Sequence, residues 1–198
     1  MKRIILFSKP TEKLISDIGE KMFPKELENK TAVYMAADNS NKEKFEKYFK
    51  EWKKLASQYS YNLIAVDNSV DSPAEHKKIL DSSVLLISGG PTFILLSRLR
   101  QNHFDNTILE FIKKSSFVLS GFSAGAIVLT PSVRIADSDF FQENTINYPT
   151  YDGLRIVDFE VLPHFKSPDW DIGINKYREN SSNEVKTITD DEYILIDK

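Results

Sequence analysis

The sequence predicts an α/β protein with a mostly parallel central sheet between two layers of helices. Short apolar runs alternate with helix-like patterns along the first 130 residues. These runs do not alternate polar and apolar residues, which is typical of strands buried on both faces in a parallel sheet. With 198 residues, of which 41% are hydrophobic and 28% charged, the chain suits one domain, predicted to span residues 1–198.

Five strands are expected before residue 130, because compact runs rich in aliphatic, β-branched and aromatic residues recur there. They are residues 3–8, 31–37, 61–66, 83–88 and 117–119. The intervening segments carry helical spacing of their apolar residues. They are residues 11–23, a long helix over 40–59, one beginning at 72, one over 91–99 and a short one at 108–114. Two starts have further signals: Ser40 with Glu43 forms a capping box, and Pro73 stands at a first helical position.

The pattern changes after Thr130, where shorter strands are expected at a mixed or antiparallel edge of the sheet. They are residues 132–136, 154–161, 185–189 and 193–196. Residues 137–152 are polar and aromatic together and are predicted to form a long loop. Long loops in compact domains are often functional.

Composition excludes several classes of protein. A formal net charge of −3 argues against a dedicated nucleic-acid binder. The chain has no cysteine, which excludes disulfides, thiolate catalysis and cysteine-containing zinc sites. No apolar run approaches a membrane span, and the first run is too short for a signal peptide. We therefore expect a cytoplasmic protein without nucleic-acid or membrane partners.

The segment GFSAG, residues 121–125, follows a buried-strand pattern and precedes a short helical run. In that context G-x-S-x-G indicates a nucleophile elbow, a sharp turn that presents serine at the carboxyl end of a sheet. Small residues are required because the turn crowds neighbouring backbone. The following helix points its N-terminus at the site and favours a developing oxyanion. Ser123 is the candidate nucleophile, and the alternative is a serine in an ordinary tight turn.

A serine nucleophile needs a base, and the chain has three histidines. His76 and His103 lie in polar helical surroundings, where a surface position is expected. His164 ends the run IVDFEVLPHF, so its imidazole is expected at a strand end, where catalytic residues collect in α/β folds. His164 is the candidate base. Gly89 and Gly90 end another strand, and an N–H from this loop could complete an oxyanion hole.

Three segments together resemble a known family: GGPTFILLSRLR, GFSAGAIVLTPSVRIAD and GLRIVDFEVLPHF. They are similar to the signature segments of the peptidase E family, aspartyl dipeptidases related to cyanophycinase with a fold like that of class I glutamine amidotransferases. The resemblance implies that Ser123 is the nucleophile, His164 the base, and Gly90 and Ala124 the oxyanion donors. One departure is Pro91, which stands where the family has asparagine and lacks both an N–H and an amide side chain.

The resemblance places the triad acid a short way after the elbow. Counting without gaps reaches Ser138, with carboxylates on either side at Asp137 and Asp139. Asp137 is the preferred candidate because it directly ends the strand-like run VRIA, and Asp139 is the alternative.

The resemblance also implies a serine peptidase for short peptides, most specifically dipeptides with an N-terminal aspartate. An acidic substrate needs a cation in the site; Arg134 is the candidate, with Lys166 and Arg178 also available. Four aromatic residues of the long loop could wall the site and limit substrate size: Phe140, Phe141, Tyr148 and Tyr151. No metal or organic cofactor is implied, and a homodimer is left open. The alternatives are an esterase-like serine hydrolase and a non-catalytic small-molecule binding protein on the same fold.

Overall fold

The computed structural model describes residues 1–197, and its centre is a six-stranded sheet of order β3-β2-β4-β5-β1-β8. The strands are β1 (Lys2–Phe7), β2 (Thr31–Met35), β3 (Asn62–Val66), β4 (Val84–Ile87), β5 (Phe117–Phe122) and β8 (Tyr193–Asp197). The first five run parallel to their neighbours, and β8 pairs antiparallel with β1. The predicted fold class is therefore confirmed. Residues 193–196 form the expected antiparallel edge, whereas residues 185–187, also expected there, pair in a separate sheet.

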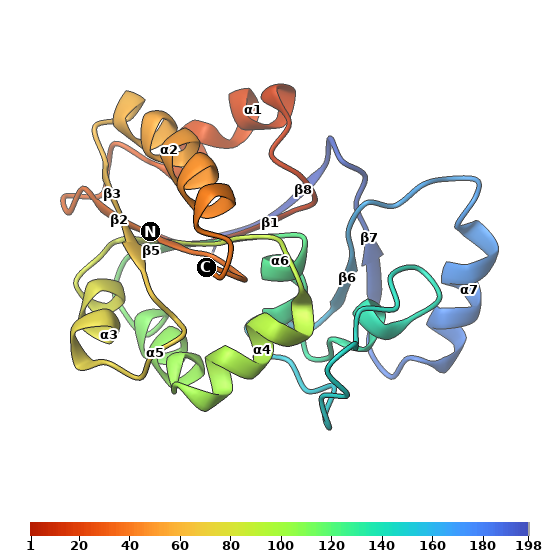
Figure 1. Cartoon of the computed structure of the whole chain (residues 1–198). Helices are drawn as coiled ribbons and strands as arrows, with labels where there is room; N and C mark the ends of the chain where they lie inside the picture. Colours follow the sequence, from red (N-terminus) through yellow and green to blue (C-terminus); the bar gives the residue numbers. More distant parts are fainter. Residues whose placement is uncertain (198) are drawn as a thin grey trace.

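Helices cover both faces of this sheet (Figure 1). One face carries α1 (Glu12–Met22) and α2 (Lys42–Gln58). The other carries α3 (Pro73–Leu80), α4 (Thr92–Gln101), α5 (Phe104–Phe111) and the short α6 (Ala124–Val128). Successive residues of β1 show why its sequence is apolar throughout: Ile4 packs into the core under α4 and α5, whereas Ile5 packs into the core under α1 and α2.

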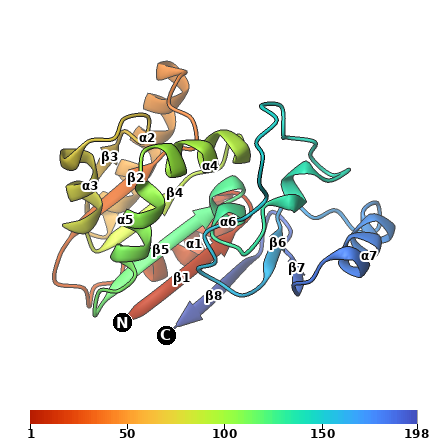
Figure 2. The ribbon, with the colours of Figure 1, turned by 90° about the horizontal axis from the view of Figure 1, so that it is seen from below.

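A smaller unit follows β5 and lies beside the β8 edge of the sheet (Figure 2). It contains a two-stranded parallel sheet of β6 (Glu160–Leu162) and β7 (Val185–Thr187), joined through α7 (Asp171–Asn180). The sequence did not indicate α7, because Ile174 is its one buried residue among those described and no apolar stripe is present.

Two strand predictions in this region were wrong. In place of the strand expected over residues 132–136, the chain forms a 3₁₀ helix, η1 (Arg134–Asp137). Ser132 makes one isolated bridge to Asp152. The expected strand over 154–161 is limited to β6. Its apolar residues 154, 156, 157 and 159 are buried against the main core without pairing in a ladder. Burial, rather than strand pairing, explains their hydrophobicity.

The predicted helix starts need two adjustments. Asn41, rather than Ser40, caps α2: its Oδ1 accepts the N–H of Lys44 at 2.9 Å. The Ser40 hydroxyl instead donates to Asp38 at 2.9 Å, and the helix begins one residue later than a capping box at Ser40 requires. Helix α5 begins at Phe104, earlier than the expected start at residue 108.

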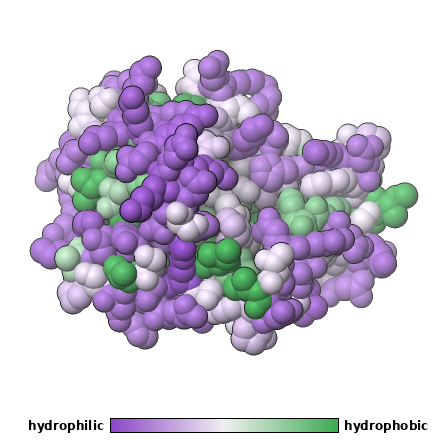
Figure 3. Space-filling model, viewed as in Figure 1, coloured by the Kyte–Doolittle hydropathy of each residue, from purple (hydrophilic) through white to green (hydrophobic). Residues whose placement is uncertain are grey.

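The surface is largely hydrophilic. In the view of Figure 3, hydrophobic residues form small separate patches between charged and polar ones. Within residues 1–197, no helix has both the length and the hydropathy required to cross a lipid bilayer.

Candidate active site

Ser123 occupies a sharp turn between β5 and α6, at the carboxyl edge of the sheet. Its φ of 49° and ψ of −117° lie outside the regions that non-glycine residues normally adopt, as a nucleophile elbow requires. The turn leaves no space beside it: a Cβ on Gly125 would overlap the carbonyl of Ile87, and one on Gly121 would overlap the backbone of Gly125. The small residues expected around the serine are therefore required sterically.

His164 faces this serine. Its Nε2 lies 3.0 Å from the Ser123 Oγ, within hydrogen-bond distance. Its backbone has a positive φ of 59° and is held by a hydrogen bond from its N–H to the Oγ of Ser8 at 2.7 Å. Ser8 is fully buried directly after β1. The structure thus brings together the predicted nucleophile and base, and adds a positioning contact from Ser8 that the sequence did not indicate.

The carboxylate next to His164 belongs to Asp190. Its Oδ1 lies 2.6 Å from the His164 Nδ1, on the ring side opposite Ser123, and accepts a 2.8 Å hydrogen bond from Ser8. Partial burial acts to raise the pKa of Asp190, but the hydrogen bonds from His164 and Ser8 and the nearby charge of Lys9 outweigh it and lower the pKa. Asp190 is therefore a carboxylate at neutral pH, and its position beside Nδ1 suits it to orient the imidazole ring of His164.

The predicted acid was wrong. Asp137 accepts a 2.6 Å hydrogen bond from the hydroxyl of Tyr151, and Asp139 does not take the place beside His164 either. The physical reason is the 3₁₀ turn of η1, which replaces the expected strand and directs the Asp137 side chain toward Tyr151. Sequence position offered no signal for Asp190, which lies 26 residues after the histidine.

Arg134, which lies in the same 3₁₀ turn, does not line the cavity at Ser123. The prediction that it binds an acidic substrate was therefore also wrong. The Arg134 guanidinium lies over the ring of Tyr151, 4.7 Å from its centroid. It lines a separate hollow with Glu160 and Tyr177. The other two cations named from the sequence are also engaged: Arg178 donates to the carbonyl of Val185, and Lys166 lies over Trp170.

The β4–α4 loop packs directly against the nucleophile. A Cβ on Gly89 would lie 3.0 Å from the Cβ of Ser123. Gly90 has a φ of 145°, which side-chain-bearing residues rarely adopt, and a Cβ there would crowd Ala37 at 2.9 Å. On the other side, Ala124 is the first residue of α6, so its N–H has no partner within the helix. Gly89 and Ala124 therefore border Ser123 directly, and Gly90 lines the same cavity as Ser123.

A carboxylate from the long loop binds the N-terminus of α4, where Pro91 precedes the helix and supplies no N–H. Glu143 accepts hydrogen bonds from the backbone N–H and the hydroxyl of Thr92, at 3.1 and 2.7 Å. This contact ties the loop of residues 137–152 to the end of α4.

The aromatic residues of that loop divide between the site and the core. Phe141 approaches His164 edge-on, with ring centroids 6.4 Å apart, and Phe140 packs on Trp170. Tyr148 and Tyr151 instead pack on the buried Phe93 of α4. Of the four aromatic residues expected to wall the site, Phe141 is the one whose ring contacts His164.

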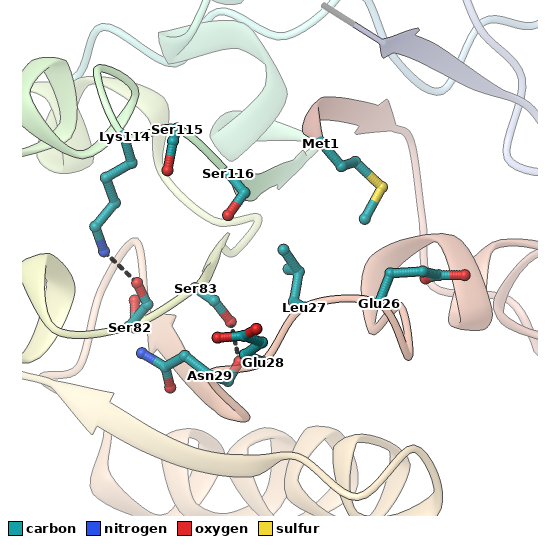
Figure 4. A pocket seen from close by; sticks show the side chains of 10 residues that line it. All are labelled: Met1, Glu26, Leu27, Glu28, Asn29, Ser82, Ser83, Lys114, Ser115 and Ser116. Carbon is teal, nitrogen blue, oxygen red and sulfur yellow. Dashed lines mark hydrogen bonds between the residues drawn. The ribbon is translucent and has the colours of Figure 1, made fainter.

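A cavity of about 550 Å³ opens at Ser123 and His164. A hollow of about 630 Å³ lies at the opposite, amino edge of the sheet and is shown in Figure 4. Its described lining includes Lys114, which donates to the carbonyl of Ser82, and several serines, but no histidine. The chemistry described above is therefore confined to the carboxyl edge.

The remaining histidines lie away from Ser123. His76 is not solvated as expected: its ring packs on Phe104 and contacts the Thr107 hydroxyl and Asp71, at 2.6 and 2.9 Å. His103 is 64% exposed. Within the described part of the chain, no group of three or more His, Asp or Glu side chains is arranged to hold a metal ion.

An α/β sheet with a serine on a strand–helix elbow and a histidine at hydrogen-bond distance defines the serine hydrolase class. Within that class, the model of peptidase family S51 matches residues 6–198. The chain belongs to peptidase family S51 and is a serine peptidase.

Known proteins agree with this assignment. An uncharacterized peptidase of Listeria monocytogenes is 28% identical over 146 residues, 73% of this chain and 70% of that protein. Peptidase E of Haemophilus influenzae is 28% identical over 125 residues, 62% of this chain and 49% of that protein. A crystal structure of a Listeria monocytogenes protein assigned as a peptidase E has a TM-score of 0.77 at 27% identity, covering 99% of this chain and 94% of that one.

Proposed function

We propose that this peptidase hydrolyses short peptides by acyl transfer through Ser123, His164 and Asp190. The observation that carries the proposal is the continuous hydrogen-bonded chain from the Ser123 Oγ through the two ring nitrogens of His164 to Asp190, with distances of 3.0 and 2.6 Å. This arrangement supports general-base activation of a hydroxyl that is otherwise a weak nucleophile.

In the proposed reaction, Ser123 forms an ester bond to the substrate carbonyl carbon while His164 accepts the hydroxyl proton. His164 then gives that proton to the leaving nitrogen as the peptide C–N bond breaks. Water, activated by His164, hydrolyses the acyl-enzyme and regenerates Ser123. The N–H groups of Gly90 and Ala124 are the donors proposed for the tetrahedral oxyanion, because Gly90 lines the cavity at Ser123 and the Ala124 N–H has no partner within α6.

The proposed limit on the length of the peptide substrate depends on the loop of residues 137–152. Phe141 borders His164, and Glu143 fixes the loop to α4 at Thr92. A loop fixed beside the nucleophile restricts the length of chain that can extend past it. We therefore propose dipeptides as the main substrates and expect no cleavage of a folded protein of casein size.

An N-terminal aspartate is the proposed first residue. A relative from Drosophila melanogaster, 26% identical over 98 residues, carries the name "probable alpha-aspartyl dipeptidase". The N-terminus of α4 already binds one carboxylate, that of Glu143, through two donors of Thr92. Helix N-termini favour anions, so we propose that this end of α4 faces the aspartyl side chain of the substrate while Glu143 stays bound to Thr92.

Two measurements test the proposal. The first is labelling by a fluorophosphonate probe, which should modify Ser123 in the wild type and fail with Ser123→Ala. That variant should also lose about a million-fold in turnover, because only binding and the oxyanion donors remain. The second is hydrolysis of a panel of X–Leu dipeptides and their N-blocked forms. A folded Ser123→Ala protein with near-wild-type activity would refute the mechanism, and equal rates for Asp–Leu and Ala–Leu would refute the acidic preference.

A further inference from the structure

The cavity at the nucleophile continues as a groove between α1 and α2. Ser123 and His164 line one end of it, and Ile15 of α1 and Leu55 of α2 line its helical walls. Its volume of about 550 Å³ lies within the range of about 300–1,000 Å³ that is usual for small-ligand sites. The groove is thus large enough for part of a peptide and is continuous with the reacting atoms.

The floor of the groove is aromatic and fixed in place. Phe122, the residue before the nucleophile, stacks on Phe7 with centroids 5.2 Å apart and lies 5.7 Å from the ring of Trp52. Trp52 is 5% exposed, so its position is set by the core. Burial raises the pKa of the lining Tyr34, offset in part by a hydrogen bond to Ser88, so the phenol stays neutral. An apolar side chain packed on these rings would gain contact, whereas a carboxylate on this floor would lose hydration that the rings cannot replace.

Two lysines also line the groove, from different elements. Lys9 follows Ser8 in the β1–α1 loop, and Lys44 lies in the first turn of α2. Among residues 1–197, neither ammonium group forms an ion pair, although the charge of Lys9 also acts on Asp190. Glu51 lines the groove as well, but it follows Lys44 by seven residues, about 10 Å along the helix axis. The groove therefore presents two lysines that form no ion pair, together with the carboxylate of Glu51, beside an apolar floor.

We propose that this groove binds the C-terminal residue of the substrate, the one that leaves as a free amino acid: its large apolar side chain packs on Trp52 and Phe122, and its carboxylate pairs with Lys9 and Lys44. This inference rests on the proposed dipeptidase function and adds the identity of the second residue. The first residue is unsuited to the groove because its acidic side chain would meet aromatic rings. In a dipeptide, the leaving residue alone carries a free main-chain carboxylate.

Substrate series test both parts of the proposal on the wild-type protein. With the first residue held constant, kcat/KM should be about 10- to 100-fold higher for leucine or phenylalanine than for alanine in the second position. C-terminal amidation of the leucine substrate should lower kcat/KM by about tenfold or more, because the lysines lose their anion. Free leucine should inhibit as a product, and free alanine and leucinamide should inhibit less.

Matched variants test whether the preference for the second residue and the dependence on its carboxylate arise in the groove. Leu55→Trp narrows the groove and should remove the preference for leucine over alanine. Leu109→Trp makes the same change at a position on α5, on the other face of the sheet, and should leave the preference intact. Lys44→Met should raise KM for the free dipeptide but not for its amide. Lys47→Met, an exposed lysine of α2 outside the groove, should change neither.

The outcomes separate this inference from the function on which it rests. A wild type that reacts with fluorophosphonate and hydrolyses dipeptides, but shows no dependence on the second side chain or on amidation, would overturn the groove assignment alone. A strong apolar preference at the first residue would do the same. Absence of both labelling and hydrolysis would overturn the proposed function and the inference together. If Leu55→Trp does not fold, the product-inhibition series on the wild type decides the assignment by itself.

Discussion

Replacing Asp190 by asparagine is the most direct test of the acid. The carboxylate lies 2.6 Å from the His164 Nδ1 and would stabilise the imidazolium that forms when Ser123 is deprotonated. An asparagine amide has no charge. It can also donate an N–H to Nδ1, which favours the tautomer in which Nε2 carries the proton and cannot accept one from the serine.

The size of the effect follows from the geometry. Two unit charges 2.6 Å apart attract by about 6 kcal/mol at an effective dielectric constant of about 20. The Asp190 side chain is 45% exposed, so solvent screening makes this an upper bound. Since each 1.36 kcal/mol is a factor of about ten in rate, the expected loss in kcat is about 10³- to 10⁴-fold. Removal of the orienting acid in other triads gives a loss of similar order, about 10⁴-fold.

The assay is steady-state hydrolysis of a dipeptide by Asp190→Asn and by the control Asp137→Asn, with circular dichroism to confirm folding. The control should stay within about threefold of the wild type, because an asparagine oxygen can still accept the hydrogen bond from Tyr151. A folded Asp190→Asn enzyme with near-wild-type kcat, or a thousandfold loss confined to Asp137→Asn, would refute the assignment of the acid.

Three further predictions follow from other features of the structure: the Ser8 hydrogen bond, the glycine contacts and the lowered pKa of Asp190. Ser8→Ala leaves the part-buried N–H of His164 without its acceptor, so urea denaturation should show a loss of about 1–2 kcal/mol together with a lower kcat; an unchanged midpoint would contradict this. Gly125→Ala places a methyl group into the backbone of β4 and should prevent folding, whereas Gly173→Ala meets only the movable ring of Phe140 and should melt near the wild-type temperature. Because the folded state lowers the pKa of Asp190, its charge stabilises the fold above about pH 4, the unfolded value, and this contribution is lost as the pH falls through the folded pKa. Denaturation of wild type and Asp190→Asn at pH 7 and near pH 3 should therefore show a difference that shrinks in acid; a constant difference would argue against the carboxylate.

The sequence alone indicated the sheet, the elbow and the candidate base, because each leaves a pattern in a few neighbouring residues. Strands buried on both faces must be apolar at consecutive positions, as Ile4 and Ile5 are. A serine in a strained strand–helix turn must have small neighbours, as Ser123 has in Gly121 and Gly125. These requirements are visible in the order of residues before any folding is considered.

The tertiary structure alone identified Asp190 as the proposed acid, Ser8 as its hydrogen-bond partner, and the groove proposed to bind substrate. Antiparallel pairing of β8 with β1 sets Tyr193 opposite Phe7, and this brings the turn containing Asp190 next to Ser8 and His164. Sequence pattern could not supply that contact, because it depends on which strand pairs with β1.

The sequence pattern also failed to predict the contacts of residues 132–152, the region after the elbow. Its apolar and charged residues predicted a strand ending in a catalytic aspartate and a substrate-binding arginine, but the chain turns into η1 and directs Asp137 and Arg134 to Tyr151. Propensity and periodicity describe what a segment could form by itself. The shared partner of these two side chains, Tyr151, lies in the same loop, and the contact depends on the folded path of that loop, which propensity does not describe.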